Sequence, residues 1–192
     1  MPKQCVARET VLDAALCIVR SKGEAALSAR AIAEVAGCSV QPIYSLFGDM
    51  PSLVGELYDH ARAWVAAYNR DHAHDGANLF ESNGFSHLRL AKTETNLFRF
   101  LYLSPHMHPR GFEELYQSVA LDGVVECIQE LGHLSEKAAH ELYLNMIVYT
   151  HGMAAMIACG AQFTERELHE RIDRSFRAFV CQVREGEGGS EA

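Results

Sequence analysis

The chain has 192 residues, of which 48% are hydrophobic, and its formal net charge is −8. This length and composition allow one or two domains with a substantial buried core. No apolar run approaches the length that a membrane-spanning helix needs, and no segment like a signal peptide precedes the first predicted helix. The six cysteines form no C-x-x-C pair, so we expect a protein of the reducing cytoplasm.

The first predicted helix carries a single apolar stripe and stops at Gly23. The members of the stripe recur at helical spacing: Val11, Leu12, Ala15, Leu16 and Val19. Such a stripe would brace the helices that follow it.

Two short helices joined by a tight turn come next. Three residues at helical spacing mark the buried face of the first one: Ile32, Val35 and Ala36. Gly37 can end that helix in a left-handed conformation. Ser28 is placed to cap the first of the two helices, and Ser39 is placed to cap the second.

The second short helix is predicted to have two distinct faces. Its inward face would pack on the preceding helix through Ile43, Leu46 and Phe47. Its outward face would present Val40, Gln41, Tyr44 and Ser45. A helix presented in this way fits the major groove of DNA, so the segment is predicted to be a helix-turn-helix.

This part of the chain resembles the TetR family of bacterial transcriptional regulators. Three features in order carry the resemblance: the helix from Val11 to Val19, the stretch from Ile32 to Ser39, and the signature Ile43, Tyr44 and Phe47. The resemblance implies an N-terminal three-helix DNA-binding domain, a helical effector-binding and dimerisation domain, and a homodimer. It also implies a repressor that a small-molecule effector releases from a palindromic operator.

Three positions depart from the commonest family pattern. Pro42 replaces a small residue or Thr, Met50 replaces a Lys that typically meets a phosphate, and Leu46 replaces a polar residue or His. With Ser39 as the cap, Pro42 falls in the first helical turn, where its missing N–H breaks no intrahelical bond. We therefore expect an intact helix with weaker nonspecific DNA binding.

The candidate DNA-binding residues differ in how they are supported. Gln41 is the best base reader, because its amide can pair bidentately with adenine. The family resemblance implies a phosphate contact for Tyr44, and Ser28 could present a helix N-terminus to a phosphate. For Ser39, Val40 and Ser45, a solvated or capping role is an alternative, and for Arg30 the alternative is an ordinary solvated charge. The full set is Ser28, Arg30, Ser39, Val40, Gln41, Tyr44 and Ser45.

Charge is distributed unevenly along the chain. The first fifty residues hold five basic and five acidic side chains, which leaves 12 basic against 20 acidic in residues 51–192. A strongly negative protein is an unusual DNA binder, because affinity comes largely from neutralising phosphates. Residues 1–50, called the head below, are thus neutral, and residues 51–192, called the body, are acidic. This distribution nevertheless keeps the body away from DNA.

The remainder of the chain is predicted to be helical throughout, so the fold class is all-α. One helix begins near Pro51, and further helices are expected over residues 88–102, about 111–131 and 135–160. The last helix follows a capping box made by Thr164 and Glu167. The predicted domains are residues 1–50 for DNA binding, residues 51–185 for effector binding and dimerisation, and a disordered tail over residues 186–192.

Two further residue sets are predicted in the body. Aromatic and Met side chains could line an effector pocket, with ordinary core as the alternative: Phe98, Tyr102, Met107, Phe112, Tyr116, Tyr149 and Met153. Small and apolar residues of the last two helices could form a four-helix dimer interface, with monomer core as the alternative: Gly152, Ala155, Leu168, Ile172, Phe176 and Phe179.

Other chemistries find less support. His106 and His108 could bind a metal with a further histidine, but no i, i+4 pair lies on one helix face, so we expect no metal and no cofactor. A redox role for Cys127, Cys159 or Cys181 competes with inert packing. No catalytic motif is present, so we expect no enzyme. The competing class is an all-α ligand-binding or protein-interaction module with weakened DNA binding.

Overall fold

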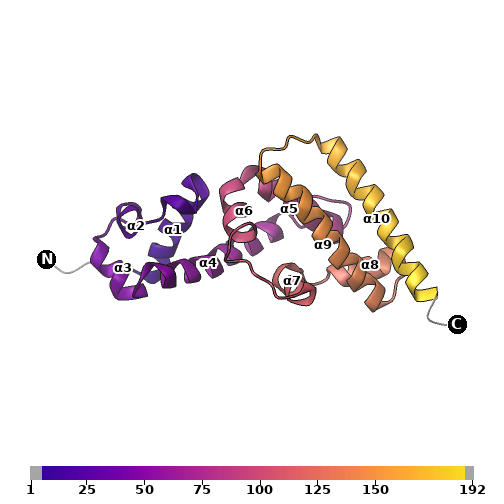
Figure 1. Cartoon of the computed structure of the whole chain (residues 1–192), viewed down its shortest axis with the longest axis horizontal. Helices are drawn as coiled ribbons and strands as arrows, with labels where there is room; N and C mark the ends of the chain where they lie inside the picture. The colour runs from indigo at the N-terminus through magenta and orange to yellow at the C-terminus, as the bar shows by residue number, and fades with distance from the viewer. Residues whose placement is uncertain (1–5, 189–192) are drawn as a thin grey trace. The chain divides into compact units, whose positions relative to one another are not determined.

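The computed structural model describes residues 6–188, with only the backbone of residues 187 and 188. In order, the helices are α1 Arg8–Lys22, the 3-10 turn η1 Glu24–Ala26, α2 Ala29–Ala36, α3 Val40–Phe47, α4 Met50–Asp71, α5 Leu79–Thr93, α6 Thr95–Tyr102, α7 Phe112–Val119, α8 Val124–Gly132, α9 Glu136–Ala158 and α10 Glu165–Gly188 (Figure 1). Residues 6–188 contain no strand. The all-α prediction is confirmed.

Packing divides the chain into two compact units. The first unit holds the described residues up to Tyr68 together with Thr93–His108, and the second holds Asn69–Lys92 and the chain from Pro109 onward. The first unit thus contains α1, α2, α3, α6 and most of α4. The functional boundary after residue 50 remains a prediction, because packing alone does not define which residues bind DNA.

Apolar helix faces build the core of the first unit. The predicted stripe of α1 is buried, as are Ile32 of α2 and Ile43 of α3. Val35 was expected on the buried face of α2, but it is 51% exposed and Ala33 is buried instead. At 100° per residue, Val35 lies more than a quarter-turn away from the centre of the face formed by Ala29, Ile32 and Ala33.

Caps and turns set the limits of the first three helices. The Ser28 Oγ accepts a hydrogen bond from the Ala31 N–H at 3.1 Å, which confirms the predicted cap of α2. Gly37 ends α2 with a φ of 67°, in the left-handed region that favours glycine. Gly23 ends α1 with a φ of 82°. The tight turn of the predicted helix-turn-helix is therefore present.

Two helices predicted as continuous are each divided. The apolar helix over residues 88–102 breaks at Glu94, between α5 and α6, and the helix over residues 111–131 breaks between α7 and α8. Gly123 has a φ of 81° at the second break, and the Leu121 N–H donates to the Tyr143 hydroxyl at 3.1 Å. Apolar spacing continued across both breaks, so periodicity could not reveal them.

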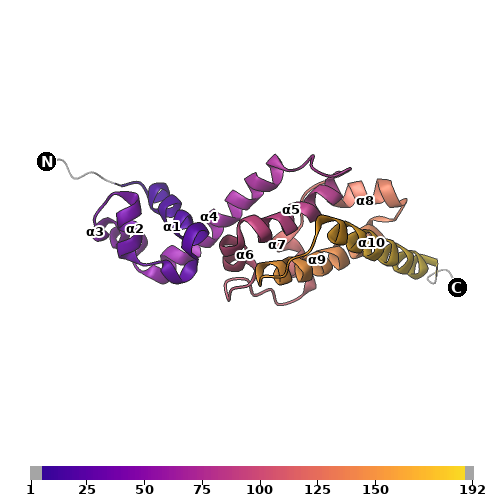
Figure 2. The ribbon, with the colours of Figure 1, turned by 90° about the horizontal axis from the view of Figure 1, so that it is seen from above.

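In the second unit α8, α9 and α10 pack side by side, as Figures 1 and 2 both show. The Ser135 Oγ caps α9 by accepting from the Ala138 N–H at 3.2 Å. The capping box of α10 is confirmed, because Thr164 N–H donates to the Glu167 carboxylate at 2.8 Å and Glu167 N–H donates to the Thr164 hydroxyl at 3.2 Å.

The end of the chain differs from the prediction in part. The helix α10 continues to Gly188, so residues 186–188 of the predicted disordered tail are helical. Residues 189–192 lie outside the described residues. Among the described residues, no helix is both long and apolar enough to cross a bilayer.

Candidate nucleic-acid interface

The short helix α3 separates its residues cleanly into an inner and an outer face. Ile43 and Phe47 are 1% and 6% exposed on the inner face. Gln41, Tyr44 and Ser45 are exposed on the outer face, with Tyr44 at 48%. The predicted orientation of the helix is confirmed at these five positions.

The start of α3 differs from the prediction at its cap. Ser39 occupies the N-cap position, but its side chain makes no capping hydrogen bond. A capping hydroxyl usually accepts from the N–H of the second or third helical residue. Here the third residue is Pro42, which has no N–H, so one of the two usual donors is missing. Ser39 and Val40, which are exposed and half-buried respectively, precede the proline on the surface of the turn.

Arg8 anchors the far end of α3. Its guanidinium donates to the Glu56 carboxylate of α4 and to the backbone carbonyl oxygen of Leu46, and it lies over the Phe47 ring at 4.6 Å. This arrangement ties the start of α1 to the end of α3. Sequence reasoning missed Arg8, because nothing in the spacing of residues 8, 46 and 56 indicates that they meet.

Polar contacts also fix the helices that support α3. Arg20 of α1 donates to Glu94 at 2.9 and 2.6 Å and lies 4.2 Å from the centre of the Trp64 ring. The hydrogen bond with Glu94 raises the pKa of Arg20, since it stabilises the charged form. His60 Nε2 lies 2.8 Å from the Asp13 carboxylate. The two arginines of α1, Arg8 and Arg20, are therefore engaged in contacts within the first unit.

The other predicted DNA-facing residues lie on α2. Arg30 is exposed, and so is Ser28 at the N-terminus of the helix, where its hydroxyl is engaged as the cap. Lys22 at the end of α1 is exposed as well. These two cations contrast with α3 itself, which has no charged side chain.

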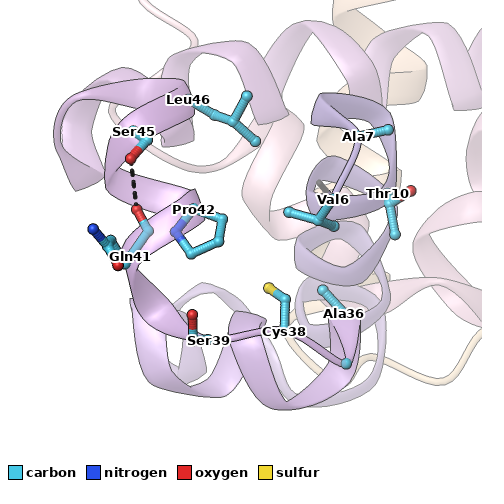
Figure 3. Close-up of a pocket in the computed structure, with 11 residues that line it drawn as sticks. Val6, Ala7, Thr10, Ala36, Cys38, Ser39, Gln41, Pro42, Ser45 and Leu46 are labelled. Carbon is cyan, nitrogen blue, oxygen red and sulfur yellow. Dashed lines mark hydrogen bonds between the residues drawn. The ribbon is translucent and has the colours of Figure 1, made fainter. Parts of the chain in front are cut away.

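A cleft of about 730 Å³ lies beside α3. Figure 3 shows Pro42 and Leu46 pointing from α3 toward Val6, two residues before α1, with Cys38 of the turn below them. Ser39, Gln41 and Ser45 complete its α3 side. None of the described residues that line the cleft carries a charge.

The predicted dimer residues occupy the last two helices. Gly152 is exposed, Ile172 is 8% exposed, and the remaining four, Ala155, Leu168, Phe176 and Phe179, are half-buried. The Phe179 ring packs edge-on to Tyr149 at 6.2 Å within the chain. Val148 and Met156, at 45% and 48% exposed, were missed, although their spacing of four from Gly152 places all three on one face of α9.

The predicted effector residues fall in both units. In the first, Phe98 is buried with its ring 5.0 Å from that of Tyr102, and desolvation raises the pKa of Tyr102 to about 12. Met107 is half-buried. In the second, Tyr116 and Met153 are buried and Tyr149 is half-buried, whereas Phe112 is 66% exposed. Their role as a pocket stays a prediction.

Histidine and cysteine side chains do not gather around a common point. Among the described residues, no group of three or more His, Cys, Asp or Glu side chains could hold a metal ion. His106 instead lies 2.7 Å from the Glu24 carboxylate, and the His108 ring lies near backbone carbonyl oxygens.

Comparison with known proteins identifies the fold. No protein-family model matches the chain, and no curated protein sequence matches it. Solved structures do match it. A TetR family transcription regulator from Marinobacter aquaeolei VT8 aligns over 90% of this chain and 93% of its own, with a TM-score of 0.53 and 20% identity.

Two more structures agree. A protein from Rhodococcus sp. assigned to the same family aligns over 90% of this chain and 98% of its own, with a TM-score of 0.60 and 16% identity. One from Mesorhizobium loti MAFF303099, similarly assigned, aligns over 91% and 95%, with a TM-score of 0.54 and 21% identity. The chain thus has the fold of TetR-family transcriptional regulators along most of its length.

Proposed function

We propose that this protein is a DNA-binding transcriptional regulator that reads duplex DNA with the outer face of α3. One observation carries the proposal: Gln41, Tyr44 and Ser45 are exposed on a short helix whose opposite face is buried against the head. A rigid helix presented in this way can enter the major groove. The shared fold with TetR-family regulators supports the proposal.

Each residue of the candidate interface has a distinct proposed role. Gln41 reads an adenine through its amide, and Tyr44 donates its exposed hydroxyl to a phosphate. Arg30 and the N-terminus of α2 behind Ser28 contact the backbone. Ser39, Val40 and Ser45 contribute neutral contacts at the edge of the groove.

The proposed regulator acts as a homodimer through α9 and α10. Val148, Gly152 and Met156 form an exposed, largely apolar face on α9, which a second copy of the chain would bury. Two copies related by a twofold axis would present two α3 helices to a palindromic operator. Sedimentation equilibrium of the full chain checks this part, and Met156→Glu should shift the protein toward monomer.

Regulation by a small molecule completes the proposal, with repression as the default. A ligand that favours the arrangement unable to span both half-sites must weaken operator binding by its difference in affinity for the two arrangements. Release of bound operator on addition of compounds from a metabolite and antibiotic panel tests this step. Failure of every compound to release the operator would remove the sensor from the proposal while leaving DNA binding in place.

DNA binding itself is tested by selecting duplexes from a random library with the full chain, followed by gel shift. We expect a selected duplex with two inverted half-sites and a binding constant that falls with salt. With few available cations on the head, the salt dependence should be shallower than for a basic head. No enrichment of any duplex would favour the alternative, a helical ligand-binding or protein-interaction module.

A further inference from the structure

We propose that the cleft beside α3 receives the C5-methyl groups of thymine, so that the half-site carries thymine next to the base read by Gln41. This inference rests on the proposed function and specifies what the same surface recognises. It assigns a role to Pro42 and Leu46, which the hydrogen-bonding roles of the neighbouring residues leave unexplained.

Hydrogen-bonding capacity on α3 is limited. Pro42 has no N–H and no polar side-chain atom, and the Ser45 hydroxyl donates to the Gln41 carbonyl oxygen at 3.0 Å. No residue of α3 carries a charge. Hydrogen-bond reading from the outer face therefore depends mainly on the Gln41 amide and the Tyr44 hydroxyl, which is little for a complete half-site.

Apolar groups are instead arranged along one flank of α3. Pro42 and Leu46 are four residues apart, so they lie one above the other, and both are half-buried. Figure 3 shows them facing Val6 across the cleft, with the thiol of Cys38 below. The result is an open cleft of about 730 Å³ with an uncharged and mainly apolar lining.

The position and chemistry of the cleft select its occupant. Ser39, Gln41 and Ser45 belong both to its lining and to the proposed DNA-facing surface, so a helix seated in the major groove brings the cleft to the base edges. A phosphate would be desolvated there without a cation. The one apolar group that base pairs present in the major groove is the thymine methyl.

Replacing thymine by uracil removes this methyl group and leaves the hydrogen-bonding pattern of the base pair unchanged. Single thymine-to-uracil replacements in a selected half-site should therefore weaken binding about fourfold at each contacted position, from the transfer free energy of one methyl-sized group. Positions outside the cleft should change little. The measurement is a competition titration with the full chain.

Variants of the cleft connect the methyl group to its partners. In the Leu46→Ala variant, replacing thymine by uracil should change the affinity less than about twofold, because part of the apolar contact with the methyl group is absent. Pro42→Ala serves as a second variant if Leu46→Ala is unstable, as its thermal melt would reveal. Arg30→Ala, at an exposed position of α2 outside the cleft lining, is the matched control, and it should keep the full uracil effect.

The outcomes separate this inference from the function on which it rests. If the protein selects a duplex but no uracil replacement changes its affinity by more than about 1.5-fold, thymine methyl recognition is wrong and DNA binding stands. A uracil effect that persists undiminished in both Leu46→Ala and Pro42→Ala also overturns it. If no duplex is selected, the proposed function itself has failed. Binding of a free apolar probe such as indole in the cleft, with a silent uracil series, would make it a small-molecule site instead.

Discussion

The two compact units hold their helices together with different polar chemistry. In the first unit, charged partners distant in sequence join the helices, as in Arg8 with Glu56 and Arg20 with Glu94. The second unit has an ion pair too, Arg89 with Asp75, but it joins α5 only to the loop before it. Neutral groups there link helix to helix: Asn83 Nδ2 donates to the Tyr143 hydroxyl at 2.8 Å, and the Ser86 hydroxyl donates to Asn69 at 2.7 Å.

This difference indicates that the positive charges of the first unit serve mainly to hold its helices together. Cations at Arg8 and Arg20 fix the helices around α3, whereas α3 itself is left neutral. Affinity for DNA would then come from fit and neutral contacts more than from phosphate neutralisation. The packing of the first unit should respond to salt, and that of the second should respond to loss of buried hydrogen-bond acceptors and to acid.

The largest expected effect comes from removing the central acceptor of the second unit. Tyr143 is only 2% exposed, and its hydroxyl accepts hydrogen bonds from the Asn83 amide and the Leu121 N–H. The variant Tyr143→Phe leaves both donors without their acceptor. The free energy of unfolding should fall by about 2–4 kcal/mol. Urea denaturation measures it. Tyr149→Phe on the same helix is the control and should cost less than about 0.5 kcal/mol.

Acid should destabilise the second unit through its neutral histidines. Desolvation lowers the pKa of His87 from 6.5 to about 3, and burial also lowers the pKa of His151, whose ring lies 5.7 Å away. Below pH 6.5 the unfolded chain binds a proton that folded His87 does not, so stability falls as the pH drops toward 3. The slope for His87 is about 1.4 kcal/mol per pH unit.

The His87→Phe variant isolates this contribution. Between about pH 6.5 and 4.5, its free energy of unfolding should decline less steeply than that of the wild type. Urea titrations at a series of pH values measure this slope. His108→Gln, at an exposed position of the first unit, should keep the wild-type slope. Equal slopes in wild type and His87→Phe would contradict a neutral His87.

A smaller effect is expected for the ion pair of the first unit. Glu94→Gln should lower stability by less than about 1 kcal/mol, because the pair is partly exposed to solvent. The loss should shrink as NaCl is raised to about 0.5 M, since salt screens the wild-type pair. Thermal melts measure both. Glu170→Gln, in an exposed i, i+4 pair, provides a control with almost no change.

The smallest effect concerns phosphate contact by the head. Arg30→Ala should weaken binding to all duplexes alike and reduce the magnitude of the salt slope by about one unit per head. Gel shifts at several salt concentrations measure this slope. A loss confined to one sequence would indicate that Arg30 reads bases.

Local signals in the sequence identified most of the head. Gly37, the Ser28 cap and the inner residues of α3 act within one or two helical turns, so their spacing is enough to predict them. The break at Glu94 was missed because its partner Arg20 lies far away in the sequence, whereas Gly123 offered a local turn signal that the continuing apolar spacing concealed. Long-range partners of this kind leave no periodic pattern.

The candidate site shows the same limit. The outward residues of α3 followed from helical periodicity, and so did the inner face. The missing cap at Ser39 goes with a proline three residues later, whose absent N–H was interpreted as compatible with the helix but not as the loss of a capping donor. The contacts of Arg8 and the cleft beside Pro42 required the fold, because they join α1 to α3.

One ratio tests the reading role of α3 most directly. It compares the affinity for a selected duplex with the affinity for the same duplex after the half-site adenine has been replaced. Wild type should discriminate about 5- to 150-fold, as expected for one bidentate base contact. Gln41→Ala should bring this ratio close to one and leave binding to the altered duplex unchanged. Equal losses on both duplexes, or a ratio that survives the substitution, would contradict the account.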